Sequence, residues 1–232
     1  MEETFVTALR SALPNLTPEQ EARFCRYYEL LTEWNEKMNL TALKGHEDTA
    51  QKHFADSVPQ AALALLKPDA KVIDVGTGAG FPGVPVLILR PDLKMTLLDS
   101  LNKRLIFLEE VLKELGLDAT LLHARAEDAG RREDCRGKFD FALSRAVAPL
   151  PVLTELTLPL LKRGGKAICY KGPAAEEEVA AAKRALDLLK GKATILCADA
   201  PWGERRLVVI EKTSPISDKF PRRPGMPENK PL

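Results

Sequence analysis

The first third of the chain has the hydrophobic spacing of amphipathic helices. Phe24 and Leu31 lie two helical turns apart on one face of a helix predicted over residues 17–37. A second helical stretch is predicted over residues 48–66, where an apolar run follows polar residues. These two elements predict an N-terminal helical subdomain covering residues 1–68.

The start of the first of these helices carries its own signal. Thr17 is suited to be the N-cap, Pro18 stands at the first helical position, and Gln20 completes a capping box. The helix is therefore expected to begin at this point.

From residue 71 onward short β-branched runs alternate with helical spacing. The predicted strands cover residues 72–75, 95–99, 119–124, 139–144 and 166–171. The predicted helices cover residues 81–89, 101–115, 150–161 and 176–190. Strands that alternate with helices in this way are typical of a parallel sheet covered by helices.

The end of the chain departs from that alternation. Strands are predicted at 193–198 and 206–212, and the loop between them is too short for a helix, so this pair must be antiparallel. We therefore expect an α/β core over 69–212 with a mostly parallel seven-stranded sheet and an antiparallel last strand. Residues 213–232 contain five prolines and are expected to form an extended basic tail outside the sheet.

Composition restricts the class of protein. A chain of 232 residues with 45% hydrophobic and 29% charged residues is an ordinary globular protein with one well-buried core. No apolar run reaches the roughly 20 residues needed to cross a bilayer, and the N-terminus lacks the pattern of a signal peptide. A cytoplasmic protein is expected.

Cysteine, histidine and charge offer little further chemistry. The four cysteines are scattered singly, which predicts reduced and mostly buried thiols, and the three histidines lack metal-ligand spacing, so no metal site is expected. The net charge of +1 does not by itself indicate a polyanionic partner, because nucleic-acid binding needs a local basic patch.

The candidate chemistry begins in the stretch KVIDVGTGAGFPGVP, residues 71–85, where a strand runs into closely spaced glycines. A phosphate loop of the Walker A type would require GK[ST] where this chain has GFPG. A dinucleotide-binding GxGxxG pattern is weakened, because Phe81 occupies the place of the third glycine.

The pattern that remains is that of S-adenosylmethionine (AdoMet) binding in a Rossmann-like class I methyltransferase. Gly76 and Gly78 would bring bare backbone close to the cofactor, and Asp99 at the end of the next strand could accept from both ribose hydroxyls. Asp74 could hold the ammonium group directly or through water. The antiparallel final pair favours the same fold, and a structural glycine turn in another α/β protein is the alternative.

Several further stretches of sequence restrict the class of methyltransferase. They are WNEKMNLTAL (34–43), KHFADS (52–57), LLDSLNKRLIFL (97–108), SRAVAPL (144–150), YKG (170–172), GERRLVVIEK (203–212) and FPRRPGMPENKPL (220–232). In this order, and together with the glycine loop, they resemble the RsmG (GidB) family of bacterial 16S ribosomal RNA guanine-N7 methyltransferases over nearly the whole chain. The resemblance implies methylation of a guanine N7 in 16S rRNA or the small ribosomal subunit, with AdoMet as cofactor and a monomeric enzyme.

The resemblance also implies which residues contact the cofactor. They are Gly76 and Phe81 in the glycine loop, Ala126 and Glu127 after the third strand, and Arg145 of SRA. The segment after the third strand is where this fold usually binds adenine. For Glu127, a solvated loop carboxylate is the alternative.

Missing motifs agree with N7 as the acceptor atom. The place after the fourth strand holds SRAVAP, where enzymes that methylate exocyclic amines usually carry [DN]PP[YFW], and none of the cysteines has the Pro-Cys context of pyrimidine C5 methyltransferases. Guanine N7 carries no proton, so no general base is expected, and positioning supplies most of the catalysis. Arg145 is the expected positioning residue, through O6 or a phosphate. A buried structural arginine paired with Asp74 or Glu127 is the alternative.

Basic residues near the strand ends and in the tail could form an RNA-binding rim. The candidates are Lys171, Arg205, Arg206, Arg222 and Arg223, and for the tail a solvated, proline-stiffened end is equally compatible. Two other functions remain open at this point: a small-molecule or protein methyltransferase, and a non-catalytic AdoMet-binding ribosome-assembly factor.

Overall fold

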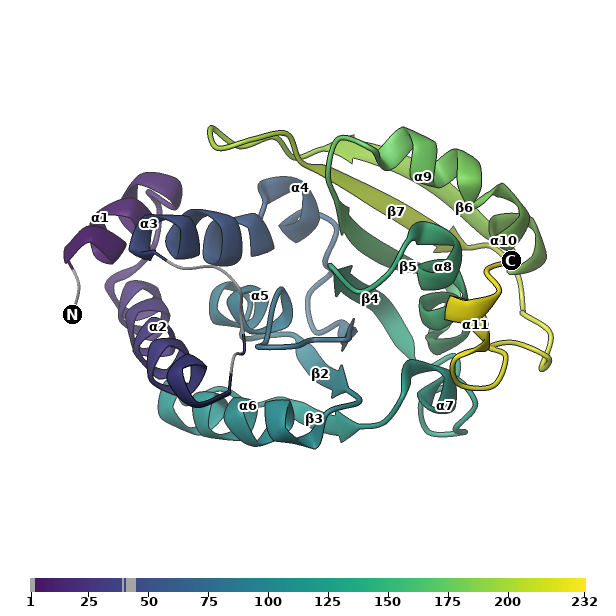
Figure 1. The fold of residues 1–232 in the computed structure, drawn as a ribbon, viewed down its shortest axis with the longest axis horizontal. Coiled ribbons are helices and arrows are strands. Elements are labelled where there is room, and N and C mark those ends of the chain that lie inside the picture. The colour runs from purple at the N-terminus through teal and green to yellow at the C-terminus, as the bar shows by residue number, and fades with distance from the viewer. Residues whose placement is uncertain (1–2, 39, 41–44) are drawn as a thin grey trace.

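The computed structural model describes residues 3–38, 40 and 45–232, and within them a seven-stranded sheet forms the centre of the molecule (Figure 1). The strands are β1 (Lys71–Val75), β2 (Lys94–Asp99), β3 (Thr120–His123), β4 (Phe139–Arg145), β5 (Leu161–Lys171), β6 (Gly191–Cys197) and β7 (Arg206–Lys212). Their order is β3-β2-β1-β4-β5-β7-β6, and β7 runs antiparallel to both of its neighbours. The predicted fold class, including its one antiparallel strand, is confirmed.

The N-terminal helices differ in part from the prediction. They are α1 (Glu3–Ala12), α2 (Pro18–Met38), α3 (His46–Asp48), a π-helical turn (Thr49–Phe54), a 3-10 turn (Ala55–Ser57) and α4 (Gln60–Leu63). The single helix expected over 48–66 is therefore wrong. Pro59 disfavours a helical conformation at Val58, which has φ −125° and ψ 42°, and the chain restarts as α4 after it.

The start of α2 follows the sequence signal. The Gln20 N–H donates to Thr17 Oγ1 at 3.2 Å, and the Thr17 N–H donates to Gln20 Oε1 at 3.0 Å. This reciprocal pair is the predicted capping box. Residues 39 and 41–43 of the WNEKMNLTAL stretch lie outside the described residues.

Helices cover both faces of the sheet. They are α5 (Gly83–Leu89), α6 (Asn102–Leu115), α7 (Ala126–Ala129), α8 (Leu150–Thr157) with a 3-10 turn (Leu158–Leu160), α9 (Ala175–Ala181) and α10 (Lys183–Leu188). The last helix, α11 (Met226–Asn229), packs on α8. The helix expected over 150–161 ends early because Pro159 cannot continue it. The helix expected over 176–190 is divided at Ala182, where φ is −85° and ψ is 0°.

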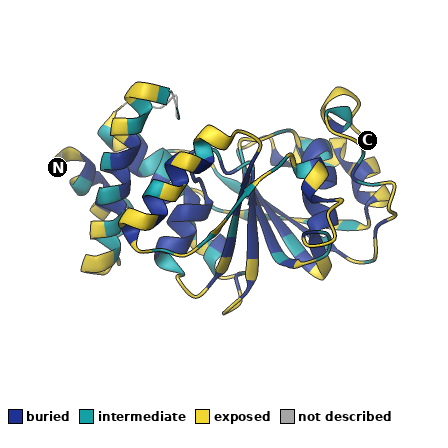
Figure 2. Cartoon of the chain, turned by 90° about the horizontal axis from the view of Figure 1, so that it is seen from below, coloured by how far each residue is buried: buried dark blue, intermediate teal, exposed yellow. Residues whose placement is uncertain are grey.

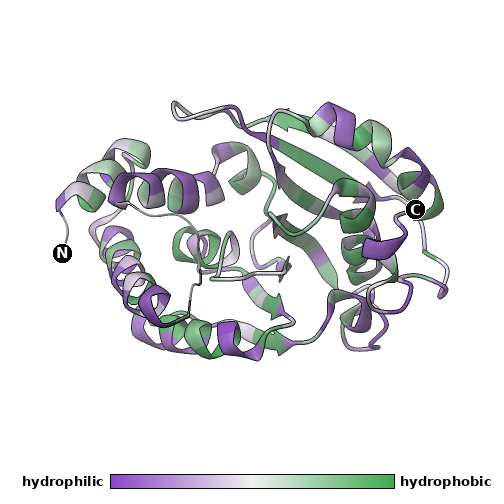
Figure 3. Cartoon of the chain, in the orientation of Figure 1, coloured by the Kyte–Doolittle hydropathy of each residue, from purple (hydrophilic) through white to green (hydrophobic). Residues whose placement is uncertain are grey.

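Two buried clusters, one on each face, hold these layers together (Figures 2 and 3). Phe24, Phe54 and Phe107 belong to the first cluster, which joins the N-terminal helices to α5, α6 and the sheet. Leu153 and Leu186 belong to the second cluster, under α8 and α10. The N-terminal helices therefore share a core with the sheet, and the expected division at residue 68 stays a prediction.

The C-terminal segment lies outside the sheet, as expected, but it is not a free extended end. Glu155 of α8 is fully buried, and its carboxylate accepts from the Arg222 backbone N–H at 2.7 Å and from the guanidinium at 2.6 Å. Arg136 donates to the carbonyls of Phe220 at 2.7 Å and Ile216 at 3.1 Å. These contacts hold residues 216–222 against α8 and the segment between α7 and β4.

The cysteines and the lengths of the helices bear on two further predictions. All four cysteines are free thiols, of which Cys197 is exposed and the other three are buried, as predicted. Among the described residues, no helix combines the length and the apolar character that spanning a membrane would require.

The Glu155–Arg222 pair gives a first testable prediction. Arg222→Ala should lower the free energy of unfolding by about 3 kcal/mol, because it leaves the buried Glu155 carboxylate without its partner. Urea denaturation measures the loss. Arg223→Ala removes the same charge from the exposed neighbouring residue and should change stability by less than about 0.5 kcal/mol. Equal effects of the two substitutions would contradict this account of the segment.

Candidate functional site

The glycine loop lies at the carboxyl end of β1, between β1 and α5 (Figure 1). The sheet order reverses between β1 and β4, and open α/β sheets bind ligands in the crevice at such a reversal. The N–H groups of Gly76 and Thr77 donate to the Leu98 carbonyl at 2.9 and 3.0 Å. These bonds attach the loop to the end of β2.

The three loop glycines have positive φ angles of 71°, 61° and 98°, but their surroundings differ. A Cβ on Gly76 would lie 2.7 Å from Val147 Cγ2, and one on Gly80 would lie 2.5 Å from the Tyr27 hydroxyl. A Cβ on Gly78 would meet only the Gly76 carbonyl oxygen, at 4.0 Å. Gly78 therefore faces open space where a ligand can approach the backbone.

Asp74 is a fully buried carboxylate beneath this loop. Its Oδ2 accepts from the Thr77 hydroxyl at 2.7 Å and from the Gly83 N–H at 2.9 Å. Its Oδ1 is buried and has no hydrogen-bond partner within the described residues. Burial raises the pKa of Asp74 to about 6, against the opposing effect of the two hydrogen bonds. The site thus holds one acceptor that lacks a donor.

Asp99 holds the glycine loop in place, and its expected contact with the ribose stays a prediction. Its side chain is 2% exposed, and its Oδ2 accepts from the Gly78 N–H at 2.9 Å and from Arg104 at 3.2 Å. Its Oδ1 accepts from the Leu101 N–H at 2.8 Å. A carboxylate has about four acceptor sites, so Oδ1 keeps capacity for a further donor.

Glu127 is not the solvated loop carboxylate considered as its alternative. It lies in the first turn of α7, is 6% exposed, and accepts from the Gly225 N–H at 2.9 Å. The neighbouring Ala126 is partly buried against the second cluster. The C-terminal segment therefore reaches the place where the family resemblance puts adenine, and the cofactor role of both residues stays a prediction.

Arg145, at the end of β4, is held by neutral groups. Its Nη1 donates to the His53 carbonyl and to the Ser57 hydroxyl, both at 3.1 Å. Its guanidinium carbon lies 5.1 Å from the centre of the Phe81 ring. Burial lowers the pKa of Arg145. Within the described residues it forms no ion pair, so the alternative of an arginine paired with Asp74 or Glu127 does not describe this structure.

Phe81 stands in the middle of an aromatic stack that the sequence did not reveal. Its ring lies 5.4 Å from Tyr27 at an interplanar angle of 17°, and 4.9 Å from His53 at 19°. Burial and the Arg145 charge lower the pKa of His53 to about 4, so its imidazole is neutral at pH 7. The KHFADS motif contains His53, but only the folded chain shows that it contacts the glycine loop.

The basic residues expected to form an RNA-binding rim are mostly engaged with carboxylates. Each pair joins two side chains: Lys171 with Glu178 at 2.6 Å, Arg205 with Asp56 at 2.8 Å, Arg206 with Asp199 at 2.5 Å and Arg222 with Glu155 at 2.6 Å. Arg223 is exposed. RNA binding by these residues stays a prediction, and any phosphate must compete with the carboxylates.

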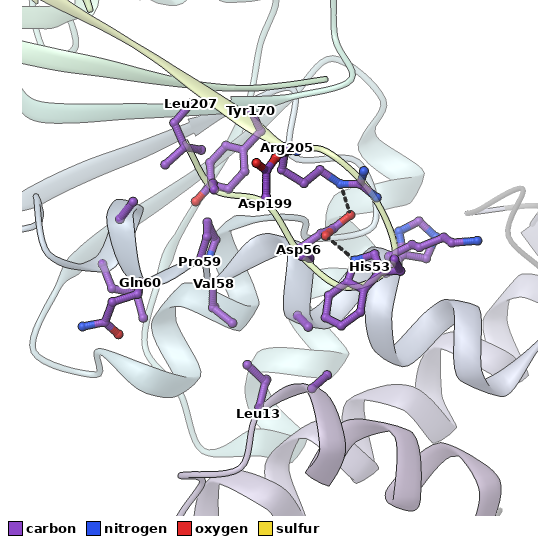
Figure 4. A pocket seen from close by; sticks show the side chains of 18 of the residues that line it. Leu13, His53, Asp56, Val58, Pro59, Gln60, Tyr170, Asp199, Arg205 and Leu207 are labelled. Atoms are coloured by element: carbon purple, nitrogen blue, oxygen red, sulfur yellow. Dashed lines mark hydrogen bonds and ion pairs between the residues drawn. The ribbon is translucent and has the colours of Figure 1, made fainter. Parts of the chain in front are cut away.

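A cavity of about 1310 Å³ opens beside the carboxyl ends of β4 and β5 (Figure 4). Arg145 at the end of β4 and Tyr170 and Lys171 at the end of β5 line it on the sheet side. Leu13 and Val58 line it on the side of the N-terminal helices (Figure 4). No glycine-loop residue takes part in the lining. Arg145 therefore stands between the loop, through Phe81, and this separate cavity.

Asp56 hydrogen-bonds to the loop between β6 and β7, which lies on another side of the cavity lining. Its two carboxylate oxygens accept from Trp202 Nε1 at 2.7 Å and from Arg205 Nε at 2.8 Å (Figure 4). The sequence motifs ADS and WGER, nearly 150 residues apart, thus meet here. A single sequence could not show this pairing, because it depends on how the N-terminal turns pack against the sheet.

Comparison with solved structures places the fold among methyltransferases. The chain resembles precorrin-6y C5,15-methyltransferase from Geobacter metallireducens, with a TM-score of 0.50, 16% identity, and coverage of 66% of this chain and 85% of that one. It also resembles TrmN from Thermus thermophilus, with a TM-score of 0.52, 24% identity, and coverage of 66% and 47%. At these identities the likeness shows the fold alone.

Comparison of sequences is more specific. A protein named ribosomal RNA small subunit methyltransferase G from Alkaliphilus metalliredigens is 45% identical, with 94% of this chain and 93% of that protein covered. A protein of the same name from Lactococcus lactis subsp. cremoris is 44% identical, with 98% of both covered. The family model GidB, described as rRNA small subunit methyltransferase G, matches residues 20–207, and the chain therefore belongs to this family of methyltransferases.

Proposed function

We propose that the chain transfers a methyl group from AdoMet to N7 of a specific guanine in 16S rRNA of the small ribosomal subunit, as a monomer in the cytoplasm. Membership of the GidB family and the names of its relatives support an rRNA substrate. The observation that carries the proposal is the place of Arg145. It contacts Phe81 of the glycine loop on one side and lines the large cavity on the other.

The residues around the glycine loop fit the proposed cofactor. The buried Asp74 Oδ1 lacks a donor within the described residues, and a cofactor ammonium group is such a donor. Gly78 faces open space, as close approach of a ligand to the backbone requires. When bound, AdoMet supplies an electrophilic methyl group. Asp74 would hold the ammonium, Asp99 Oδ1 the ribose, and Ala126 and Glu127 the adenine.

Arg145 would position the acceptor guanine. The contacts to His53 and Ser57 use its terminal nitrogens, which leaves the Nε–H without a bond within the described residues. This donor could serve guanine O6 or a phosphate, while N7 stays free. The neutral His53 beside it is not needed as a base, because N7 has no proton to lose.

The cavity is the proposed approach for the RNA. Its volume of about 1310 Å³ exceeds that of a usual small-molecule site, so it can admit more than one nucleobase. Lys171, Arg205 and Arg206 lie along its lining, where they could exchange their carboxylate partners for phosphates. A small metabolite would leave much of this space empty.

Cells without the gene test the function directly. Their 16S rRNA should lack one 7-methylguanosine, measured by nuclease digestion and mass spectrometry. The wild-type gene should restore the modification, whereas Arg145→Ala should restore less than about a tenth of it at equal protein level, because the acceptor loses its positioning group. Unchanged 7-methylguanosine in the deleted strain would refute the proposed function. An AdoMet-binding assembly factor without catalytic activity would give that result.

Gly78→Val tests the placement of the cofactor. The added side chain would enter the open space in front of the loop at a φ of 61°, which β-branched residues adopt poorly. AdoMet binding, measured by isothermal titration calorimetry, should weaken at least about 100-fold while the chain stays folded by circular dichroism. Gly116→Val is a matched control, since Gly116 also has positive φ and an open surrounding but lies at the end of α6. It should bind AdoMet normally.

The raised pKa of Asp74 predicts a dependence on pH. The ionised carboxylate binds the ammonium, so AdoMet affinity should rise about tenfold between pH 5 and pH 7, through the pKa of about 6. Asp74→Asn, whose amide is nearly isosteric, should bind weakly and show no such rise. Calorimetry at several pH values makes the comparison.

The same shift has a consequence for stability without cofactor. The folded pKa lies above the ordinary value of 3.8, so ionisation of Asp74 opposes folding, and the wild-type chain should lose stability as pH rises from about 4 to about 6. The shift of the Asp74 pKa from 3.8 to about 6 corresponds to a loss of about 3 kcal/mol in the free energy of unfolding. Asp74→Asn cannot ionise and should not show this loss. Identical pH profiles for the two chains, measured by urea denaturation, would contradict the assigned state of Asp74.

A further inference from the structure

Tyr27 of α2 reaches from the N-terminal helices into the glycine loop. Its side chain is fully buried, and its hydroxyl donates to the backbone carbonyl of Ala79. Ala79 lies between Gly78 and Gly80, in the part of the loop that faces the proposed cofactor. Burial raises the pKa of Tyr27 well above its usual value, so the hydroxyl keeps its proton and acts as the donor.

The lack of a side chain at Gly80 allows the Tyr27 hydroxyl to lie against the backbone of the glycine loop. A Cβ at this position would lie 2.5 Å from the Tyr27 hydroxyl oxygen, closer than two such atoms can approach. The loop and α2 are therefore fitted to each other at this point. The last glycine of the GxGxG pattern makes room for a side chain of the N-terminal helices, whereas Gly78 leaves room for a ligand.

The ring of Tyr27 makes a second contact with the loop. It stacks on Phe81, which stacks in turn on His53 of the π-helical turn. Glycine-rich loops have few intrinsic restraints, because glycine tolerates many backbone angles. One hydrogen bond at Ala79 and one stacked ring at Phe81 hold the two ends of the segment 79–81.

We propose that Tyr27 is a positioning residue for the AdoMet site, acting through the glycine loop without touching the cofactor. The inference rests on the proposed cofactor site and extends it to the N-terminal helices. With Ala79 held by Tyr27 and the Gly78 N–H held by Asp99, the backbone at Gly78 presents one fixed surface to the ligand. Without the hydroxyl, the free loop samples other conformations and the ligand must order it on binding.

Tyr27→Phe tests this with the smallest possible change, since it removes only the hydroxyl and keeps the stack on Phe81. The dissociation constant of AdoMet should rise about tenfold, the size expected when a buried carbonyl loses its donor. The KM for AdoMet should rise with it, while kcat at saturating AdoMet stays within about twofold. Amide hydrogen exchange in residues 76–83 of the cofactor-free chain should become faster.

Tyr28→Phe is the matched control. Tyr28 is the next residue of α2, is 7% exposed, stacks on Phe5, and has its hydroxyl bonded to His46 Nδ1. Both substitutions remove a partnered hydroxyl from the same helix, but within the described residues the hydroxyl of Tyr27 bonds the glycine loop and that of Tyr28 bonds His46. Tyr28→Phe should therefore leave AdoMet affinity and loop exchange unchanged, even where it lowers the melting temperature.

The outcomes separate this inference from the proposed function. If Gly78→Val abolishes AdoMet binding while Tyr27→Phe binds like the wild-type chain, the role of Tyr27 is refuted and the cofactor site stands. If Tyr27→Phe and Tyr28→Phe weaken AdoMet binding equally, the loss of affinity results from a less stable α2, and the inference is also refuted. If Gly78→Val binds normally, the cofactor site itself is misplaced. Tyr27→Leu, which removes the stack as well, should weaken binding more than Tyr27→Phe.

Discussion

The buried carboxylate of Asp74 is the constraint on which the site depends. A carboxylate removed from water requires hydrogen-bond donors, and the chain supplies two of them from one short segment, the Thr77 hydroxyl and the Gly83 N–H. These two bonds fold residues 77–83 around the end of β1 and fix the start of α5. Within the described residues these donors bond only Oδ2. Burial raises the pKa of the carboxyl against the effect of the two bonds, so a cationic ligand at Oδ1 would stabilise the ionised form.

Around that loop, parts distant in sequence converge through contacts of different kinds. Tyr27 of α2 bonds the Ala79 carbonyl, and His53 of the π-helical turn stacks on Phe81. Arg145, at the end of β4, lies over the Phe81 ring. The C-terminal segment contacts Glu127 through the Gly225 N–H. The N-terminal helices and the C-terminal segment therefore both contact residues of the proposed cofactor site, although neither belongs to the alternating strands and helices. Binding of the proposed cofactor would then be sensitive to changes far from the glycine loop.

The sequence predicted the framework well because its signals are local. The period of apolar residues located every strand, the Thr17–Gln20 pair set the start of α2, and the short final loop required an antiparallel strand. The acids stood out because Asp74 lies just before the glycines that follow one strand and Asp99 ends the next strand. The breaks at Pro59 and Pro159 were also visible as residues, but the apolar run around them suggested continuous helices.

What the sequence did not show depends on long-range packing. Arginines that looked like a surface rim are engaged by carboxylates whose positions only the fold determines, such as Asp56 for Arg205 and Glu155 for Arg222. The contacts of Tyr27 and His53 with the glycine loop stayed hidden for the same reason, since helical spacing shows that a face is buried but not which residues it contacts.

The surroundings of Arg145 show why the partners of an arginine matter for its chemistry. A guanidinium paired with a carboxylate has its charge compensated and its donors directed to that partner. Arg145 is held instead by a carbonyl, a hydroxyl and a neutral imidazole, while the carboxylate of Asp56 is occupied by Trp202 and Arg205. Its positive charge is thus desolvated but uncompensated by direct contact, as the lowered pKa indicates. A partly buried charge in that state interacts strongly with any electron-rich partner that reaches it, and Arg145 lines the large cavity. The fold itself satisfies a structural arginine such as Arg222, whereas the Nε–H of Arg145 has no bond within the described residues and is available to the proposed acceptor.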